Sequence, residues 1–365
     1  MAFSRPASAL LLIVLFWFAA AAGFSGFAGK WGLRERDPDG YRFGATAMLE
    51  STAARPFVYR QLAPVLANLA ARITPARVKN FVVAHLDPAA TFTRLTQLNT
   101  SELQFKATVI LYLSFLALFL NLFVLRQIAL DAGSGRLSAI IAPMTLALAM
   151  PYLQTVGGYF YDNIEFLFLS LAFLLAARGR YLLLLVLVVP ANFNKESFLF
   201  FLPALYPLLR LTLSKLKARL VLLAALCLSA GENLLVRRQF ANTAGGAVEF
   251  HLRDNLSTYV KNWAYREWEL TYGLIGPRGL FIGTIVVVAI IVIRGLGSCP
   301  AAIKRHLAYA AMINLPLVLL FGSPGEIRNL AFLFVGFSVL VALAINATLR
   351  PQDVQKSSLY CQGGR

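Results

Sequence analysis

Apolar residues run along this chain in long blocks, and ten of these blocks have the composition of membrane helices. They lie at 7–29, 105–125, 137–156, 163–177, 181–191, 197–209, 218–236, 279–293, 307–321 and 329–349. About 20 apolar residues in a helix cross the hydrocarbon core of a bilayer. The pattern predicts an all-α polytopic membrane protein of about ten helices, in which residues 1–365 form a single integral membrane domain.

The blocks at 181–191 and 197–209 are shorter than the others. At 1.5 Å per residue each spans about 16–20 Å, whereas the hydrocarbon core is about 30 Å thick. Pro190 and the polar residues at 192–196 interrupt what would otherwise be one long helix. We therefore expect a helical hairpin, of a kind that can be re-entrant.

Two long polar segments, 30–104 and 237–278, separate the blocks. The first has apolar residues at helical spacing, typical of helices lying on a membrane surface. They are Leu62, Val65, Leu66, Leu69 and Ile73, followed by Val78, Phe81 and Val82. The second segment has aromatic residues among charges, as at a membrane interface. These are Trp263, Tyr265, Trp268 and Tyr272.

Composition excludes a soluble protein, and charge orients the chain. It is 58% hydrophobic, with a mean hydropathy of +0.67 and a net charge of +17. The connections 126–136, 178–180, 210–219 and 294–305 hold eleven Lys/Arg and one acid, whereas 152–165, 192–197 and 322–328 hold two Lys/Arg and four acids. The positive-inside rule therefore predicts an inner (cytoplasmic) membrane protein with both termini in the cytoplasm.

This orientation places the tail at 350–365 inside and the two polar segments outside. Reading 181–209 as one span would put seven basic residues of short loops outside, so the hairpin is favoured. Residues 1–28 also look like a signal peptide. The many later spans favour a retained first helix instead.

The excess of basic residues is spread over many loops, which argues against a nucleic-acid partner. Membrane lipids and a phosphate-bearing substrate are favoured instead. The three cysteines form no disulfide pattern, and His85, His251 and His306 are scattered along the chain. We therefore expect no metal site and no cofactor.

Of the seventeen acids, only Asp131 and Asp353 belong to the inner side in this orientation. Any acid–base chemistry is therefore expected outside. Asp37-Pro38-Asp39 follows the first span, and a carboxylate there could take a proton from an attacking hydroxyl. The alternative is that these acids are solvated or cap the next helix.

Arg55 and Arg60 flank a tight segment that includes Tyr59. Guanidinium groups bind phosphate through paired N–H donors, although snorkelling to lipid phosphates is an equal alternative. Asp162 and Glu165 are three residues apart, so they share a helix face at the start of a span. Stabilisation of the helix dipole is the alternative there, and stacking of the nearby Tyr161 on a sugar is a weaker inference.

Asn194, Lys195 and Glu196 lie at the tip of the hairpin. Ionisable groups at that depth face a cavity or a partner, so either Lys195 binds an anionic head group or the two charges pair. Glu326 and Arg328 precede the last span. Glu326 can simply stabilise a helix start, while Arg328 needs a partner, for which Glu232 is a candidate.

Together these features resemble the GT-C class of membrane glycosyltransferases, which take sugars from polyprenyl-phosphate carriers. The segments RPFVYRQLAP, YFYDNIE, NKES and GEIRN look like those of a bacterial family of GT-C-like membrane proteins. The resemblance covers most of the chain. It implies a large first outer loop, an acid after the first span that acts as base, and basic residues that hold the carrier phosphate.

The resemblance implies Asp37 or Asp39 as the base, with Asp162 as a rival, because the context found in protein mannosyltransferases is missing around Asp37-Pro38-Asp39. It implies phosphate contacts from Arg55, Arg60, Lys195 and Arg328. Further candidate substrate contacts are Tyr59, Tyr161, Glu165, Asn194, Glu196 and Glu326. The expected reaction is an inverting transfer from a polyprenyl-phosphate-linked sugar to a glycan, lipid or protein acceptor.

Two other classes of protein remain open. A transporter or flippase for lipid-linked glycans would also contain an interrupted hairpin and buried charges, although the paired repeats it predicts are missing. A polymerase of lipid-linked glycans usually carries its large loop later in the chain.

Overall fold

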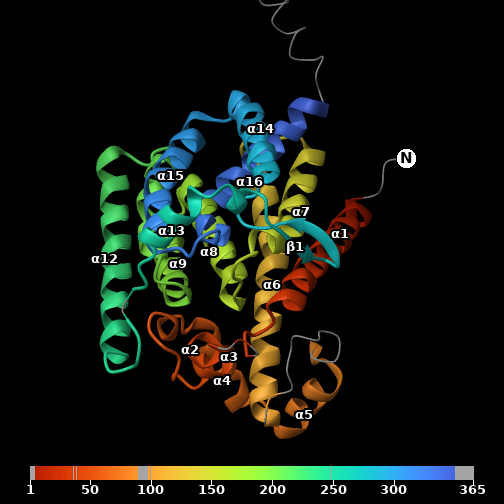
Figure 1. Cartoon of the computed structure of the whole chain (residues 1–365). Coiled ribbons are helices and arrows are strands. Elements are labelled where there is room, and N and C mark those ends of the chain that lie inside the picture. Colours follow the sequence, from red (N-terminus) through yellow and green to blue (C-terminus); the bar gives the residue numbers. More distant parts are fainter. Residues whose placement is uncertain are drawn as a thin grey trace, which may run out of the picture.

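The computed structural model describes residues 5–35, 37, 39–88, 98, 100–246 and 248–349, with side chains from Ser8 onward (Figure 1). Pro38 and the predicted tail at 350–365 lie outside the described residues. Among the residues that the structure describes, six helical segments are long and apolar enough to cross a membrane. The chain is therefore a helical membrane protein, as predicted.

These six segments belong to α1 (Arg5–Lys30), α6 (Ser101–Asp131), α7 (Arg136–Leu153), α8 (Phe160–Ala177), α12 (Lys215–Gln239) and α16 (Ala331–Leu349) with the preceding η5 (Ile327–Leu330). The four other predicted blocks coincide with α9 (Tyr181–Asn194), with α10 (Phe198–Phe201), η3 (Leu202–Leu205) and α11 (Tyr206–Leu209), with α14 (Ile282–Ser298) and with α15 (Ala301–Phe321). Every predicted block is thus helical, but only six satisfy the length and hydropathy of a complete span.

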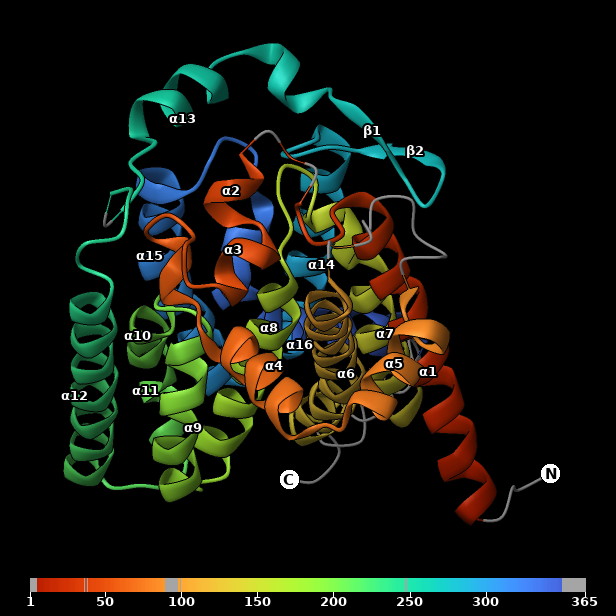
Figure 2. The same cartoon turned by 90° about the horizontal axis from the view of Figure 1, so that it is seen from below.

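The number of helices also differs from the ten expected, because the polar segments fold into further short helices. These are α2 (Gly40–Phe43), α3 (Ala45–Leu49), η1 (Phe57–Tyr59), α4 (Leu62–Ile73), α5 (Ala76–His85), α13 (Leu252–Tyr259) and η4 (Asn262–Tyr265). Viewed along the bundle, α2 to α5 lie across one of its ends (Figure 2).

In the described part of the chain, the structure is all-α apart from one small β-hairpin, which was not predicted. Strands β1 (Trp268–Thr271) and β2 (Leu274–Pro277) pair antiparallel, with Thr271 opposite Leu274. The connecting residues Tyr272 and Gly273 both have positive φ, of 57° and 74°. Two-residue turns of this handedness match the twist of paired strands. Aromatic residues predicted as interface anchors therefore belong partly to a sheet.

The two short arms of the predicted hairpin return to the same end of the bundle. Leu208 and Leu211, at the end of the second arm, line a common cavity with Arg178, which lies just before the first. Between the arms, Lys195 is extended, with φ −158° and ψ 121°, and breaks the helix. The predicted interruption is therefore present at Lys195, but Pro190 lies inside α9 and does not end it, so the first arm extends to Asn194 rather than to residue 191.

The long α6 is the centre of the fold. It packs against α1, α7 and α8 within the bundle, and against α4 and α5 near its N-terminal end. Helix α4 turns small residues such as Ala63, Ala67 and Ala71 inward, while Leu69 and Ile73 stay exposed. Small residues allow close helix contact, so the apolar outer face of α4 is left available to lipid, as expected for a surface helix.

Single cysteines placed at His85 and Ser214 should report opposite faces of the membrane, because His85 ends α5 and Ser214 precedes α12 at the other end of the bundle. In a background with the three native cysteines replaced by serine, an impermeant maleimide should label only one of them in intact cells. Thr100→Cys, beside the start of α6, should behave as His85→Cys does. Labelling of His85→Cys and Ser214→Cys from the same face would contradict this arrangement.

Candidate functional site

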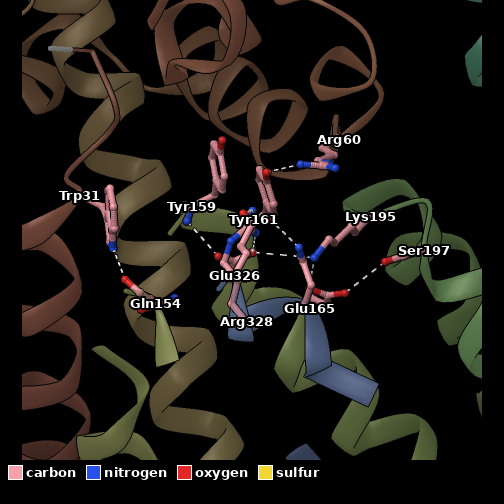
Figure 3. Close-up of polar contacts among 12 residues, drawn as sticks. Trp31, Arg60, Gln154, Tyr159, Tyr161, Glu165, Lys195, Ser197, Glu326 and Arg328 are labelled. Atoms are coloured by element: carbon pink, nitrogen blue, oxygen red, sulfur yellow. Dashed lines mark hydrogen bonds and ion pairs between the residues drawn. The ribbon is translucent and has the colours of Figure 1, made fainter. Parts of the chain in front are cut away.

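Five segments that are far apart in the sequence meet where α2 to α5 cover the bundle. They are the chain after α1, the segment before α4, the start of α8, the turn between α9 and α10, and the start of α16. Charged side chains from the last four of these segments lie together, with Arg60 linked to α8 through the Tyr161 hydroxyl, and we call them the charged cluster (Figure 3). It consists of Arg60, Asp162, Glu165, Lys195, Glu196, Glu326 and Arg328.

Arg328 lies at the centre of the charged cluster and is 94% buried, with 6% of its surface exposed. Its Nη1 donates to Asp162 Oδ1 at 2.9 Å, and its Nη2 donates to Glu326. The second oxygen of Asp162 accepts from the Tyr159 backbone N–H at 2.9 Å, capping α8. The remaining donor, Arg328 Nε, is buried and has no acceptor among the described residues.

Glu326 is held in an ionised state by its neighbours. Burial opposes its charge, but the charge and hydrogen bond of Arg328, the Ser323 N–H and the charge of Lys195 together outweigh burial and lower the pKa of Glu326 below its ordinary value. Its Oε2 accepts from the Ser323 backbone N–H at 3.1 Å and from Asn329 Nδ2 at 2.6 Å. The acid therefore anchors the turn before α16 and also balances Arg328.

Lys195 forms the second ion pair of the cluster. Its Nζ donates to Glu165 Oε2 at 2.6 Å and lies 3.9 Å from Asp162 Oδ1. Ser197 Oγ donates to the other oxygen of Glu165 at 3.2 Å. Asp162 and Glu165, on one face of α8, thus face two cations from different segments, Lys195 in the hairpin turn and Arg328 in η5.

Arg60 forms the third ion pair and is the most exposed of the three cations of the cluster. Its Nε and Nη2 donate to the two oxygens of Glu196 at 3.3 and 3.2 Å, and its Nη1 contacts the Tyr161 hydroxyl. Burial opposes the charge of Glu196, yet Arg60 lowers the pKa of this acid. The Glu196 side chain is 19% exposed, which is more than the other carboxylates of the cluster.

Aromatic rings separate the cations from one another. Tyr159 and Tyr161 stack with centroids 5.0 Å apart and an interplanar angle of 10°. The Arg34 and Arg328 guanidinium groups lie 4.9 and 4.6 Å from the Tyr159 ring, and that of Arg60 lies 4.7 Å from the Tyr161 ring. Cation–π contact lowers the cost of burying these charges together.

Two glycines allow the segments to approach this closely. A Cβ atom at Gly157 would lie 2.9 Å from Glu326 Oε1, and one at Gly158 would lie 2.5 Å from Trp31 Cδ1. Real Cβ contacts are longer, so a larger residue would push Trp31 or Glu326 away. The Gly157-Gly158 pair is therefore a packing requirement of the site.

The acids after α1 take different positions. Asp37 pairs with Arg34, while its Oδ1 accepts no hydrogen bond from the described residues. Asp39 is exposed at the start of α2 and makes no side-chain capping bond. Glu35 accepts from the Thr46 backbone N–H at 2.6 Å, and burial raises the pKa of Glu35. Only Asp37 is connected to the cluster, through Arg34 against Tyr159.

Other predicted residues lie away from the charged pairs. The Arg55 backbone N–H donates to the Ala244 carbonyl at 2.8 Å, so Arg55 joins the segment after α12. Tyr59 is buried with the Arg237 guanidinium 5.8 Å from its ring. Asn194 Nδ2 donates to the Tyr161 carbonyl at 3.1 Å, which ties the hairpin turn to α8. Glu232 is not the partner of Arg328, since Asp162 and Glu326 occupy that position.

Sequence reasoning missed three residues of the site, namely Trp31, Arg34 and Gln154. Trp31 Nε1 donates to the Gln154 carbonyl at 2.5 Å, and the Gln154 side-chain amide is buried without a partner among the described residues. The sequence signal for these residues was weak but present. An aromatic residue and a cation directly after the first span are typical of an interface position, and Gln154 ends a span.

The cluster is a preorganised polar site at the end of an apolar bundle. Its three cations and four carboxylates are nearly balanced, as buried charges require. Within the described ranges, no group of three or more His, Cys, Asp or Glu side chains is arranged to hold a metal. Such a site can bind an anion by exchange for a carboxylate, or pass a proton between carboxylates.

No protein-family model, curated protein or solved structure matches this chain.

Replacing Arg328 by glutamine should destabilise the protein strongly, because Asp162 and Glu326 would stay buried without their cation. Loss of one partner of a buried pair costs about 3–5 kcal/mol. The thermal unfolding midpoint in detergent should fall clearly, and Asp162→Asn in the same chain should restore part of it. Arg178→Gln, which breaks an exposed pair with Asp131, is the control and should cost about 0–1 kcal/mol. Equal effects of Arg328→Gln and Arg178→Gln would contradict the central role of Arg328.

Proposed function

We propose that the protein is a membrane glycosyltransferase that moves a sugar from a polyprenyl-phosphate carrier to an acceptor outside the cytoplasmic membrane. The observation that carries the proposal is the meeting of four charged motifs, distant in sequence, at one end of the bundle beneath the long first loop. A lipid-linked substrate reaches such a place sideways from the bilayer, while an acceptor reaches it from water.

The carrier phosphate binds at Arg60 in this proposal. The contacts of Arg60 with Glu196, at 3.2 and 3.3 Å, are longer than the 2.6 Å contact of Lys195 with Glu165. Glu196 is also the most exposed carboxylate of the cluster, so it can turn to water and release the guanidinium fork. A phosphate accepts two N–H bonds in the same geometry. Lys195 and Arg328, directly beneath, stabilise the charge of the leaving phosphate.

Asp37 is the favoured base. Asp162 uses one oxygen for the Tyr159 N–H and the other for Arg328, and it is buried, which suits a structural acid. Asp37 is 26% exposed, and one of its oxygens accepts no hydrogen bond from the residues that the structure describes, while Arg34 links Asp37 to Tyr159. In the reaction, Asp37 takes the proton of the acceptor hydroxyl, whose oxygen bonds to the anomeric carbon. The carbon–oxygen bond to phosphate breaks, so the anomeric centre inverts.

Charge supports the proposed orientation. The site end carries the acids, while the opposite connections carry eleven Lys/Arg and one acid. The positive-inside rule then directs the opposite end and both termini to the cytoplasm, with the loops at 30–104 and 237–278 outside. An outer site is also where glycans, lipids and proteins of the cell envelope are available as acceptors.

Transport of a lipid-linked glycan is the second candidate, and the near balance of charge in the cluster favours it. Transport sites also pair ionisable groups within broken helices. Reconstituted vesicles distinguish the two candidates. A transferase releases free polyprenyl phosphate only when an acceptor is present, whereas a transporter moves the intact lipid-linked sugar across the bilayer without an acceptor.

Asp37→Asn should abolish most turnover, because an amide cannot take the acceptor proton. General-base catalysis contributes roughly 10²–10⁴-fold, so a loss of at least 100-fold is expected in carrier release from a mixed pool of polyprenyl-phosphate sugars. Asp39→Asn is the matched control and should retain activity, since its side chain is exposed and apart from the cluster. Undiminished turnover in a chain that carries both Asp37→Asn and Asp39→Asn would remove both acids as candidates for the base.

Arg60→Lys and Glu196→Gln should change substrate affinity in opposite directions. Lysine keeps the charge but loses the paired donors, so the KM for the carrier-linked sugar should rise. Glutamine removes the competing carboxylate, so the KM should fall while the thermal midpoint drops only slightly. Steady-state kinetics in nanodiscs measures both. A higher KM for Glu196→Gln would argue against phosphate binding by exchange at Arg60.

A further inference from the structure

A second candidate site lies at the opposite end of the bundle, where several helices end or begin at the top of Figure 1. It has apolar walls and a charged edge. Here the ends of α6, α8 and α11 and the start of α15 surround a cavity of about 440 Å³. Its walls are almost entirely apolar, as Phe173, Leu174, Leu208 and Ile303 illustrate. A cavity of this size and lining is in the range of small-molecule sites in proteins.

One ion pair stands at the edge of this cavity. Arg178 donates through Nε and Nη2 to the two oxygens of Asp131, at 2.9 and 3.2 Å. Both side chains are well exposed, at 45% and 38%. An exposed pair contributes little stability, so another anion can replace Asp131 on the guanidinium fork.

The surroundings of the cavity favour an anion. Asp131 is the single acid among the eleven basic residues of the four connections at this end. These are Arg126, Arg136, Arg178, Arg180, Arg210, Lys215, Lys217, Arg219, Arg294, Lys304 and Arg305. The first turn of α15 also faces the cavity through Ala302, and helix starts present N–H donors and a positive dipole.

We propose that this cavity binds an anionic phospholipid, with one acyl chain between the helix ends and the phosphate on Arg178. The apolar walls exclude a free phosphate or nucleotide, which would leave most of the cavity without a suitable contact. The basic connections favour an anionic lipid over a zwitterionic one. Basic pockets between membrane helices recognise anionic head groups in this way. The assignment is independent of glycosyl transfer.

Native mass spectrometry of the full chain in neutral detergent tests the assignment, with phosphatidylglycerol and phosphatidylcholine as probes. The chain should retain phosphatidylglycerol in preference to phosphatidylcholine. Arg178→Gln should reduce that retention about fivefold, as expected for one basic contact. Arg136→Gln removes the same charge at the same end without lining the cavity, so it should leave retention unchanged.

A second variant tests the acyl-chain position. Leu211 is exposed and lines the cavity, so Leu211→Trp fills space without disturbing the buried core, and it should lower retention of both lipids. The thermal midpoint verifies that each variant is folded. Equal losses in Arg178→Gln and Arg136→Gln would show diffuse electrostatic attraction only. Unchanged retention in Leu211→Trp would overturn the cavity as the binding site.

Discussion

The pairing of Arg328 with Asp162 and Glu326 is the interaction on which the rest of this end of the molecule depends. A guanidinium group buried to 94% is tolerated in an apolar bundle only when carboxylates and aromatic rings replace water around it. Asp162 is also the cap of α8, and Glu326 also anchors the turn before α16. One charge therefore fixes the relative position of two membrane helices and of the loops that precede them.

The other ion pairs extend this constraint outward, and from the inside to the outside their contacts become longer and more exposed. Lys195 joins the hairpin turn to α8 through a short, buried bond with Glu165, and Arg60 joins the surface segment to the hairpin through longer, more exposed bonds with Glu196. The pairs thus become easier to exchange toward the loop side of the cluster. A rigid inner pair beneath an exchangeable outer pair is the arrangement that the proposed binding of a carrier phosphate at Arg60 requires.

The apolar and charged patterns of the chain predicted much of this molecule. The ten apolar blocks all became helical, and the polar motifs before α4, at the start of α8, in the hairpin turn and before α16 supplied the charged cluster. The β-hairpin was not predicted, because its short strands depend on the turn at Tyr272-Gly273 rather than on a long alternating pattern. Trp31 and Arg34 were missed because a single aromatic residue and a single cation after a span are common at any interface.

The sequence by itself determined which segments form apolar helices and which end of the bundle carries the acids, because both depend on local composition and on the cost of placing charge among apolar side chains. Only the tertiary structure decided how the charges pair. Arg328 and Asp162 are 166 residues apart, and Glu232 was an equally reasonable partner from hydropathy alone. Which carboxylate lies within 3 Å of a guanidinium depends on how the helices are ordered around α6, and no local pattern encodes that order.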